Sequence, residues 1–376
     1  MAKLSLEELT SLVASLVTAN KVSNATFSAT RDNIVGLLDK IGKIVTLDTI
    51  YTRDKLARFD GEYLSFGKTI EDWQQDLILP TSYDSTGANA LSPSDPTYRP
   101  VYYSYTLGRK KIKESIRNDN IERAVHFSAE FVSIVAMQYK RLEDSMAVYR
   151  YQLKREMLGV LAKMCYDTLP ANVSAFATST AYSVGDVKKG THGGSTISGI
   201  FVKAVANTNT QTFTQLVSAG TIIPLDLYQE VAIPEDTSTG EAFLKQVKAD
   251  VEIASDISEG HSLNGNTLGA TEGLVLLVKQ GIMPVLDVDT LAGAFHLDKV
   301  AIPVEVIVVK DFGDTSSMSN KPYAILMDGR GMRLHNTYNA VRENFNGDGD
   351  FLNIFRHTED TAYISRNTFV KIYADD

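Results

Sequence analysis

The longest regular pattern of apolar residues lies between Ile121 and Asp167, a stretch that contains no proline and one glycine, Gly159. Most of its apolar residues recur at intervals of three and four, which places them on one face of a helix. They are Ile121, Val125, Val132, Val135, Tyr139, Leu142, Met146, Tyr149, Leu153, Met157, Val160 and Met164. The pattern predicts one very long helix, or two helices almost in line, spanning roughly 70 Å if unbroken. Leu169-Pro170 ends it, because proline disfavours helix in the preceding residue.

Two shorter amphipathic patterns precede this stretch. One runs from Ser5 to Val17 and opens with a capping box of Ser5 and Glu8, and the other covers about Arg31 to Ile44. They predict an N-terminal arm that packs on something else. Residues 51–107 then contain glycines and four prolines between short alternating runs, which predicts an out-and-back β excursion. Such a segment buries little against itself, so we expect it to lie on a partner.

The chain beyond the long helix mixes strand and helix patterns. Strands are predicted at Ile197–Val205, Thr212–Val217 and Gly273–Val278. A capping box at Ser238–Glu241 predicts a helix with Phe243, Val247, Val251 and Ala254 on one side, and Asp289 caps a short helix through Phe295. The C-terminal part alternates as strands, with turns at Asp328-Gly329 and Asn346-Gly347. These strands are Pro303–Val309, Tyr323–Met327, Met332–Tyr338, Phe351–Arg356, Thr361–Ser365 and Thr368–Tyr373.

Composition narrows the class of protein. With 376 residues, 44% of them hydrophobic, the chain can bury a substantial core. A net charge of -9 argues against a protein that wraps nucleic acid with a basic face. The single cysteine, Cys165, lies among apolar residues, so we expect a buried core thiol and a reducing compartment. No segment approaches the length of a membrane span and no secretion signal is present, which predicts synthesis in a cytosol.

No motif in the chain predicts chemistry. Gly67-Lys68-Thr69 lacks the first glycine of a phosphate-binding loop, and His192-Gly193-Gly194-Ser195 lacks a nucleophile elbow, so both are read as turns. Asn346, Asp348 and Asp350 match only the start of a calcium loop, and a hairpin turn is favoured there. The six histidines show no metal-ligand spacing. We therefore predict no catalytic residue, no metal site and no cofactor.

Four segments carry a resemblance to a known family. They are Leu38-Asp39-Lys40-Ile41-Gly42, Phe66-Gly67-Lys68-Thr69-Ile70-Glu71-Asp72, Leu286-Asp287-Val288-Asp289-Thr290-Leu291-Ala292-Gly293-Ala294-Phe295 and Val306-Ile307-Val308-Val309-Lys310-Asp311-Phe312. In this order, with the patterns between them, they resemble the major capsid proteins of tailed bacteriophages, whose coat fold is named for phage Hong Kong 97. They are most similar to the coat proteins of small phi29-like podophages, over about Ile34 to Tyr373.

The resemblance implies an α+β coat fold with four parts. Residues 1–55 would be an N-terminal arm, residues 56–110 an extended β loop, residues 111–170 with 303–376 a peripheral domain containing the spine helix, and residues 171–302 an axial domain. It also implies a protein that assembles through pentamers and hexamers into an icosahedral or prolate shell around double-stranded DNA. The implied partners are other copies of the chain, a scaffolding protein, a portal, and packaged DNA in weak nonspecific contact, with no membrane. The implied locations are the virion capsid and, during assembly, the host cytoplasm.

Four apolar residues of the extended loop are candidates for contact with a neighbouring subunit: Leu64, Phe66, Ile70 and Trp73. Trp73 is the only tryptophan, and aromatic anchors dominate interface energetics, although packing inside its own subunit stays open. Two other functions also remain open. A cellular nanocompartment shell would use the same fold, and a soluble enzyme would need a pocket with convergent polar groups.

Overall fold

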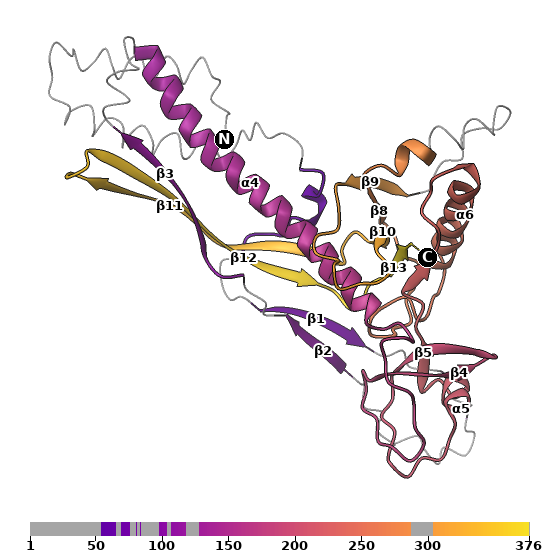
Figure 1. The fold of residues 1–376 in the computed structure, drawn as a ribbon. Coiled ribbons are helices and arrows are strands. Elements are labelled where there is room, and N and C mark those ends of the chain that lie inside the picture. The colour runs from indigo at the N-terminus through magenta and orange to yellow at the C-terminus, as the bar shows by residue number, and fades with distance from the viewer. Residues whose placement is uncertain are drawn as a thin grey trace.

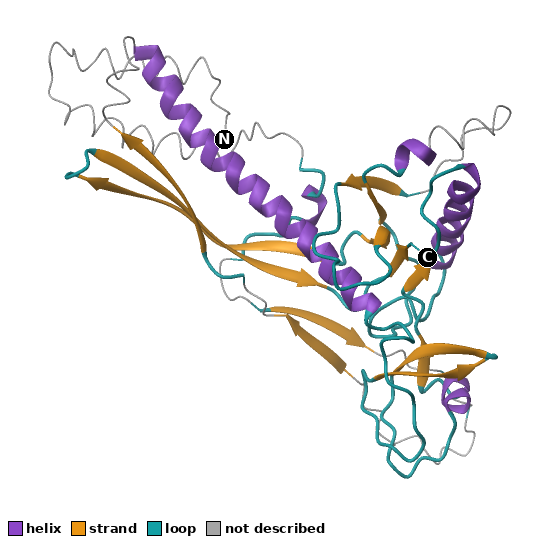
Figure 2. Cartoon of the chain, in the orientation of Figure 1, coloured by secondary structure: helices purple, strands orange, loops and turns teal. Residues whose placement is uncertain are grey.

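A computed structural model describes residues 54–64, 69–75, 80, 83, 98–103, 107–117, 128–286 and 304–375. The predicted helices near Ser5–Val17, Arg31–Ile44 and Asp289–Phe295 lie outside these residues. The molecule is elongated, and one helix runs diagonally from a long, narrow sheet at one end to a broader sheet at the other (Figures 1 and 2). The strands and helices thus form an α+β fold.

The diagonal helix is α4, which runs unbroken from Ser128 to Tyr166, a length of 39 residues or about 58 Å. The predicted long helix is therefore confirmed as a single helix over the described residues. Its apolar face is partly different from the prediction, because Val160 is 50% exposed. In the last three turns the buried face is instead formed by Met157, Leu158, Leu161, Ala162 and Cys165. Apolar residues lie at helical spacing on two faces of this part of α4, and the five-stranded sheet packs against the face that does not contain Val160.

The broader sheet has five strands in the order β7-β13-β10-β8-β9. Its strands are β7 (Tyr228–Glu230), β8 (Leu274–Lys279), β9 (Glu305–Val309), β10 (Pro322–Asp328) and β13 (Val370–Ala374). β10 is antiparallel to both β8 and β13, whereas the β8–β9 and β13–β7 pairs are parallel. The predicted buried strand at Gly273–Val278 is confirmed as β8, whose first five residues are all buried.

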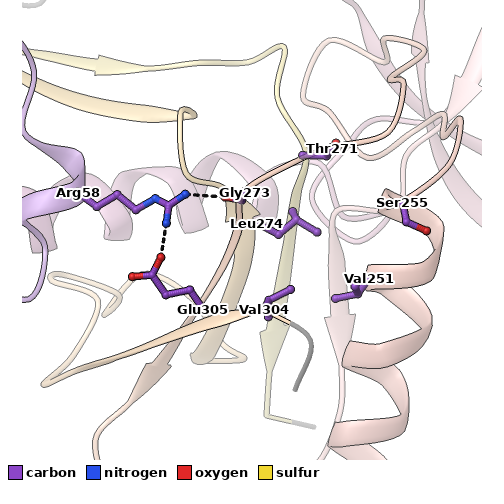
Figure 3. Close-up of a pocket in the computed structure, with 8 residues that line it drawn as sticks. All are labelled: Arg58, Val251, Ser255, Thr271, Gly273, Leu274, Val304 and Glu305. Carbon is purple, nitrogen blue, oxygen red and sulfur yellow. Dashed lines mark hydrogen bonds and ion pairs between the residues drawn. The ribbon is translucent and has the colours of Figure 1, made fainter. Parts of the chain in front are cut away.

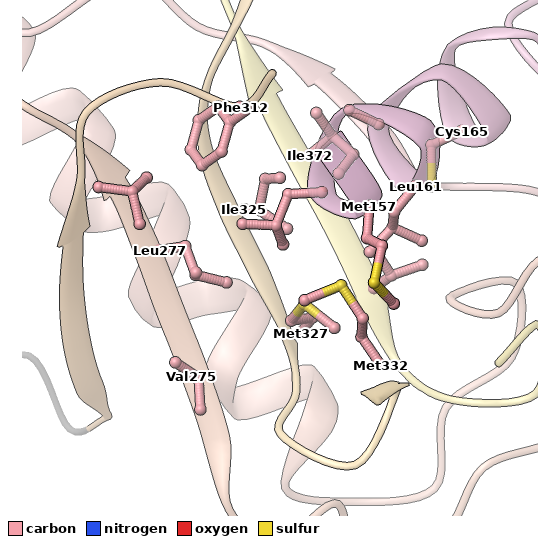
Figure 4. Close-up of a cluster of buried hydrophobic side chains, with 14 of the residues drawn as sticks. Met157, Leu161, Cys165, Val275, Leu277, Phe312, Ile325, Met327, Met332 and Ile372 are labelled. Atoms are coloured by element: carbon pink, nitrogen blue, oxygen red, sulfur yellow. The ribbon is translucent and has the colours of Figure 1, made fainter. Parts of the chain in front are cut away.

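Helices cover both faces of this sheet. On one face Met157, Leu161 and Cys165 of α4 pack in the same cluster as Val275, Leu277, Ile325, Met327 and Ile372 (Figure 4). On the other face Phe243 and Val247 of α6 (Thr237–Ala254) pack in a cluster with Leu276, Leu326 and Tyr373. Alternate residues of each strand thus enter opposite cores, which is why the strands are apolar almost throughout. The helix begins earlier than predicted, because Asp236 is the N-cap and forms the capping box with Thr239.

The long, narrow sheet has the order β11-β12-β3 and is antiparallel throughout. It consists of β3 (Lys110–Arg117), β11 (Met332–Asn346) and β12 (Phe351–Ile364). The strands predicted at Phe351–Arg356 and Thr361–Ser365 are one continuous strand, so the hairpin is longer than predicted. The turn at Asn346-Gly347 is confirmed: Asn346 Oδ1 accepts hydrogen bonds from the amides of Asp348 and Gly349 at 3.0 and 3.2 Å.

A small unit forms the third part of the molecule. It contains β4 (Val187–His192), β5 (Ser195–Phe201), β6 (Ile222–Pro224) and the short helix α5 (Phe213–Ser218). The predicted turn at His192–Ser195 joins β4 to β5, with Gly193 and Gly194 at φ of 60° and 84°. The strand predicted at Thr212–Val217 is wrong, because this segment is α5. A capping box makes this segment helical. The Thr212 hydroxyl accepts a hydrogen bond from the Gln215 amide, and the Gln215 side-chain oxygen accepts one from the Thr212 amide.

Candidate intersubunit contact site

The excursion that the sequence predicts to contact a neighbour begins beside β11. After the short helix η1 (Ala57–Phe59), the amides of Gly61 and Leu64 donate hydrogen bonds to the carbonyls of Leu334 and Asn336 at 3.0 and 2.9 Å. Asp60 forms a parallel bridge with Leu334. The base of the excursion therefore lies along the edge of the long hairpin, which fixes the path of residues 60–64.

A group of charges fastens this base to α4. We call it the junction cluster: Asp54, Asp60, Arg150, Lys154 and Asp360. Lys154 is fully buried, and its ammonium contacts Asp54, Asp60 at 2.7 Å and the Leu56 carbonyl at 3.2 Å. Arg150 lies 3.4 Å from Asp60 and 3.5 Å from the buried Asp360. Because removing one member of a buried charge group leaves the others uncompensated, the cluster strongly favours one arrangement of excursion, helix and hairpin.

Further out, the excursion forms a two-stranded antiparallel hairpin of β1 (Ile70–Gln75) and β2 (Tyr98–Tyr103). Asp72 in β1 fixes this hairpin to the end of β12. Its Oδ2 accepts hydrogen bonds from Oη of Tyr363 in β12 at 3.1 Å and from Oγ of Ser365, just after β12, at 2.7 Å. Hydrogen bonds to a carboxylate are about twice as strong as neutral ones. The hairpin is therefore anchored at its base.

The four predicted contact residues lie on this excursion. Leu64 and Ile70 are half-buried, and Trp73 lies in β1 opposite Pro100. Phe66 and the side chain of Trp73 are outside the described residues. No neighbouring subunit is present, so their contact with one stays a prediction. Sequence reasoning missed Asp72 and the junction cluster, although a lysine at position 154, inside an apolar helical pattern, was a signal that a carboxylate would be needed.

Charged groups elsewhere on α4 are structural. Glu143 forms an ion pair with Arg356 of β12, and both side chains are at most 10% exposed. Burial raises the pKa of Glu143 above its ordinary value, and the nearby Arg356 partly offsets this.

Burial also raises the pKa of Cys165 far above that of a free thiol. The prediction of a core thiol at Cys165 is confirmed by its complete burial, and such a thiol is a poor nucleophile.

One hollow of about 350 Å³ opens between η1, α6 and the edge of the five-stranded sheet. Arg58 and Glu305 form an ion pair at one side of it, and Arg58 also donates a hydrogen bond to the Gly273 carbonyl at 3.0 Å, so the charges of Arg58 and Glu305 neutralise each other (Figure 3). It is lined by Arg58, Val251, Ser255, Thr271, Gly273, Leu274, Val304 and Glu305. Among the described residues, no group of three or more histidine, cysteine or acidic side chains could hold a metal ion. The helices in this part of the chain also lack the length and apolar character of a membrane span.

The comparisons with known proteins show the fold and the family of this chain. A chain in the capsid structure of Staphylococcus phage Andhra is similar, with a TM-score of 0.53, 10% identity and coverage of 88% of this chain and 85% of that chain. A chain in the structure of head fiber and inner core protein gp22 of native bacteriophage P68 has a TM-score of 0.54, 12% identity and coverage of 85% and 83%. No curated protein sequence matches. The model of the family described as Phi29-like phage major capsid protein matches residues 5–370. The chain therefore belongs to the Phi29-like phage major capsid proteins, and this family makes it a shell-forming structural protein and not an enzyme.

Proposed function

We propose that this capsid protein assembles through pentamers and hexamers into an icosahedral or prolate shell that encloses double-stranded phage DNA. The observation that carries this proposal is the continuous helix α4, which joins the long sheet to the five-stranded sheet with the hairpin of β1 and β2 anchored between them. A subunit of this shape can overlap its neighbours at several separate places. Self-association into capsomers follows from the family. Scaffolding protein, portal and weak contact with DNA are proposed as partners, and assembly is proposed to occur in the host cytoplasm.

We assign four parts to the subunit in this proposal. Residues 1–55 form the arm, 56–110 the extended loop, 111–170 and 303–376 the peripheral domain, and 171–302 the axial domain. The boundary near residue 303 runs through the five-stranded sheet, since β7 and β8 come from one side of it and β9, β10 and β13 from the other. The two domains would share that sheet and move together. Neither a nanocompartment shell nor an enzyme is favoured by the family match.

The proposed role of Leu64, Phe66, Ile70 and Trp73 is to fill apolar contacts on the next subunit. The junction cluster and Asp72 support this role, because a loop held at its base loses less entropy when it docks than a free one. The remaining stabilisation would come from the area of contact repeated around each capsomer. We therefore expect that replacing Trp73 by alanine weakens assembly more than it weakens the fold of the subunit.

Light scattering after size exclusion, with negative-stain microscopy, tests the proposal on the purified chain, alone and with its scaffolding protein. We expect rings of five or six subunits or closed shells. Trp73→Ala should raise the subunit concentration needed for assembly about tenfold or more, as loss of an aromatic anchor costs on the order of 2 kcal/mol. A stable monomer at high concentration under both conditions would contradict the proposed assembly.

A further inference from the structure

The tip of the long hairpin carries a chemically labile dipeptide. Asn-Gly occurs twice in the sequence, as Asn264-Gly265 and as Asn346-Gly347. An asparagine followed by glycine can lose its side-chain amide, because the main-chain nitrogen of the next residue attacks the side-chain carbonyl carbon and glycine has no Cβ atom to obstruct the approach. The two sites share this dipeptide, so a difference in their reactivity comes from the structure around them.

Asn346-Gly347 is open to this reaction. It lies where β11 turns into β12, at the end of the molecule far from the five-stranded sheet (Figure 1). Asn346 and every residue up to Asp350 are exposed, so water and hydroxide reach the site. Among the residues that the structure describes, the Gly347 amide has no hydrogen-bond acceptor. The attacking nitrogen is therefore not tied to another group.

The carbonyl that would be attacked is also activated. Asn346 Oδ1 accepts hydrogen bonds from the amides of Asp348 and Gly349 at 3.0 and 3.2 Å. These donors polarise the carbonyl and stabilise the negative charge that forms on its oxygen when the carbon is attacked, as the donors of an oxyanion hole do. The turn that closes the hairpin thus also favours attack on the Asn346 side chain.

Asn264-Gly265 is protected by its surroundings. Gly265 is buried, and its amide donates a hydrogen bond to the Ser262 carbonyl at 3.0 Å. The Asn264 side chain donates a hydrogen bond from Nδ2 to Asn367 Oδ1 at 2.6 Å. A Cβ atom on Gly265 would meet the Ile200 side chain at 2.3 Å, so the turn is tightly packed. Both the attacking nitrogen and the amide that would leave are held in place here.

We propose that Asn346 is a site of spontaneous deamidation in the folded subunit, whereas Asn264 is not. The Gly347 nitrogen loses its proton to hydroxide and forms a bond with Cγ of Asn346. The Cγ–Nδ2 bond breaks, and the departing nitrogen takes a proton from water and leaves as ammonia, so that a cyclic imide remains and hydroxide is regenerated. Water then opens the imide at either carbonyl carbon and gives aspartate or isoaspartate. The sum of these steps converts an amide and water into a carboxylic acid and ammonia, without oxidation or reduction.

The reaction changes the tip of the hairpin. Either product places a carboxylate near the exposed residues Asp348 and Asp350, which makes the tip more acidic. Isoaspartate also adds one carbon atom to the main chain between positions 346 and 347, beside the pair of Asn346 and Phe351 that closes the hairpin. Because the reaction needs only water and time, older subunits differ from newly made ones at this position.

Peptide mapping by mass spectrometry tests the proposal on the purified, unassembled subunit. After incubation at mildly alkaline pH, the tryptic peptide of residues 343–356 should gain about 1 Da at Asn346. The peptide of residues 249–279 should react at Asn264 at least about tenfold more slowly. In urea both sites should react, because unfolding removes the protection of Asn264. If Asn346 stays intact in the folded subunit, or if Asn264 reacts there as fast as Asn346, the proposal fails.

Two variants separate the reaction from the fold. Gly347→Ala keeps Asn346 and should slow its deamidation about tenfold or more, because the methyl group obstructs the approach of the nitrogen. This variant should fold normally, since the nearest atom to an added Cβ is Phe345 Cε1 at 3.7 Å, an ordinary contact. Asn346→Gln should abolish the reaction at this position, because the longer side chain would have to close a larger ring.

Circular dichroism of the same samples shows that each variant is folded. An unchanged rate at Asn346 in the Gly347→Ala chain would overturn the proposed attack by the Gly347 nitrogen. All of these measurements use the unassembled subunit, so their outcome is independent of whether the chain assembles as proposed above.

Discussion

Replacing Gly159 by alanine should destabilise the subunit, although alanine is the better helix former. Gly159 is the one glycine in the long apolar pattern, and it lies in α4 where the loop after β9 crosses the helix. A Cβ atom there would meet the Phe312 carbonyl oxygen at 2.4 Å, about 1 Å closer than ordinary van der Waals contact. The close approach of helix and loop therefore requires a residue without a side chain.

The loop cannot move away at low cost. Its Asp311 forms an ion pair with Arg155, its Asp314 amide donates a hydrogen bond to Glu156 Oε2 at 3.2 Å, and the Phe312 ring is 2% exposed in the core. Overpacking of this kind costs about 1–3 kcal/mol, and a rigid backbone obstacle favours the upper end. The gain in helix propensity from glycine to alanine is about 1 kcal/mol. The net effect is a loss of about 2 kcal/mol.

Urea unfolding of the unassembled subunit, followed by far-UV circular dichroism, measures this loss. Val160→Ala is the matched control: it is the next residue on α4, its side chain is half exposed, and alanine is again the better helix former. We expect this control to match or slightly exceed the native stability. A Gly159→Ala chain as stable as the native chain, or more stable, would show that the contact with the Phe312 carbonyl does not require glycine at this position.

Two further predictions concern buried titratable groups. Lys154→Met should lower the free energy of unfolding in urea by about 2–3 kcal/mol. This is less than the usual loss for a buried ion pair, because the two partner carboxylates, Asp54 and Asp60, are partly exposed. The control Lys245→Met, in an exposed helix pair, should lower it by less than about 0.5 kcal/mol. A loss as small as that of the control would contradict a stabilising junction cluster. Burial lowers the pKa of His261 below its ordinary value of 6.5. As the pH falls, the unfolded chain therefore binds a proton at this histidine before the folded chain does, and the stability of the fold decreases below about pH 6.5. The decrease in the urea midpoint between about pH 7.5 and 5.5 should be smaller for His261→Gln, and an equal decrease would show that His261 contributes nothing to it.

The sequence predicted elements whose pattern depends on local spacing. The long helix, the buried strand β8 and the turn at Asn346 could be read from periodicity and turn residues. Thr212–Val217 was misread as a strand because alternating β-branched and apolar residues also suit a short helix, and the Thr212–Gln215 capping box decides between them. The face of α4 that is buried near Val160 could not be chosen, because it depends on where the sheet packs.

The candidate site could be predicted only in part. The β excursion and its apolar residues have a local pattern, but Lys154 and Asp54 are 100 residues apart, and Asp72 and Tyr363 are 291 apart. No periodicity relates such positions. The cations Lys113 and Arg342 illustrate the same point, since they come to lie on one face of the long sheet only through the register of its three strands. Net charge alone therefore concealed a local surface of the opposite sign.

Cryo-electron microscopy of shells assembled from the native chain would show how the subunits contact one another. We expect capsomers of five and six subunits in which the hairpin of β1 and β2 from each subunit lies over the next subunit. Shells in which each extended loop folds back on its own subunit would contradict the proposed assembly.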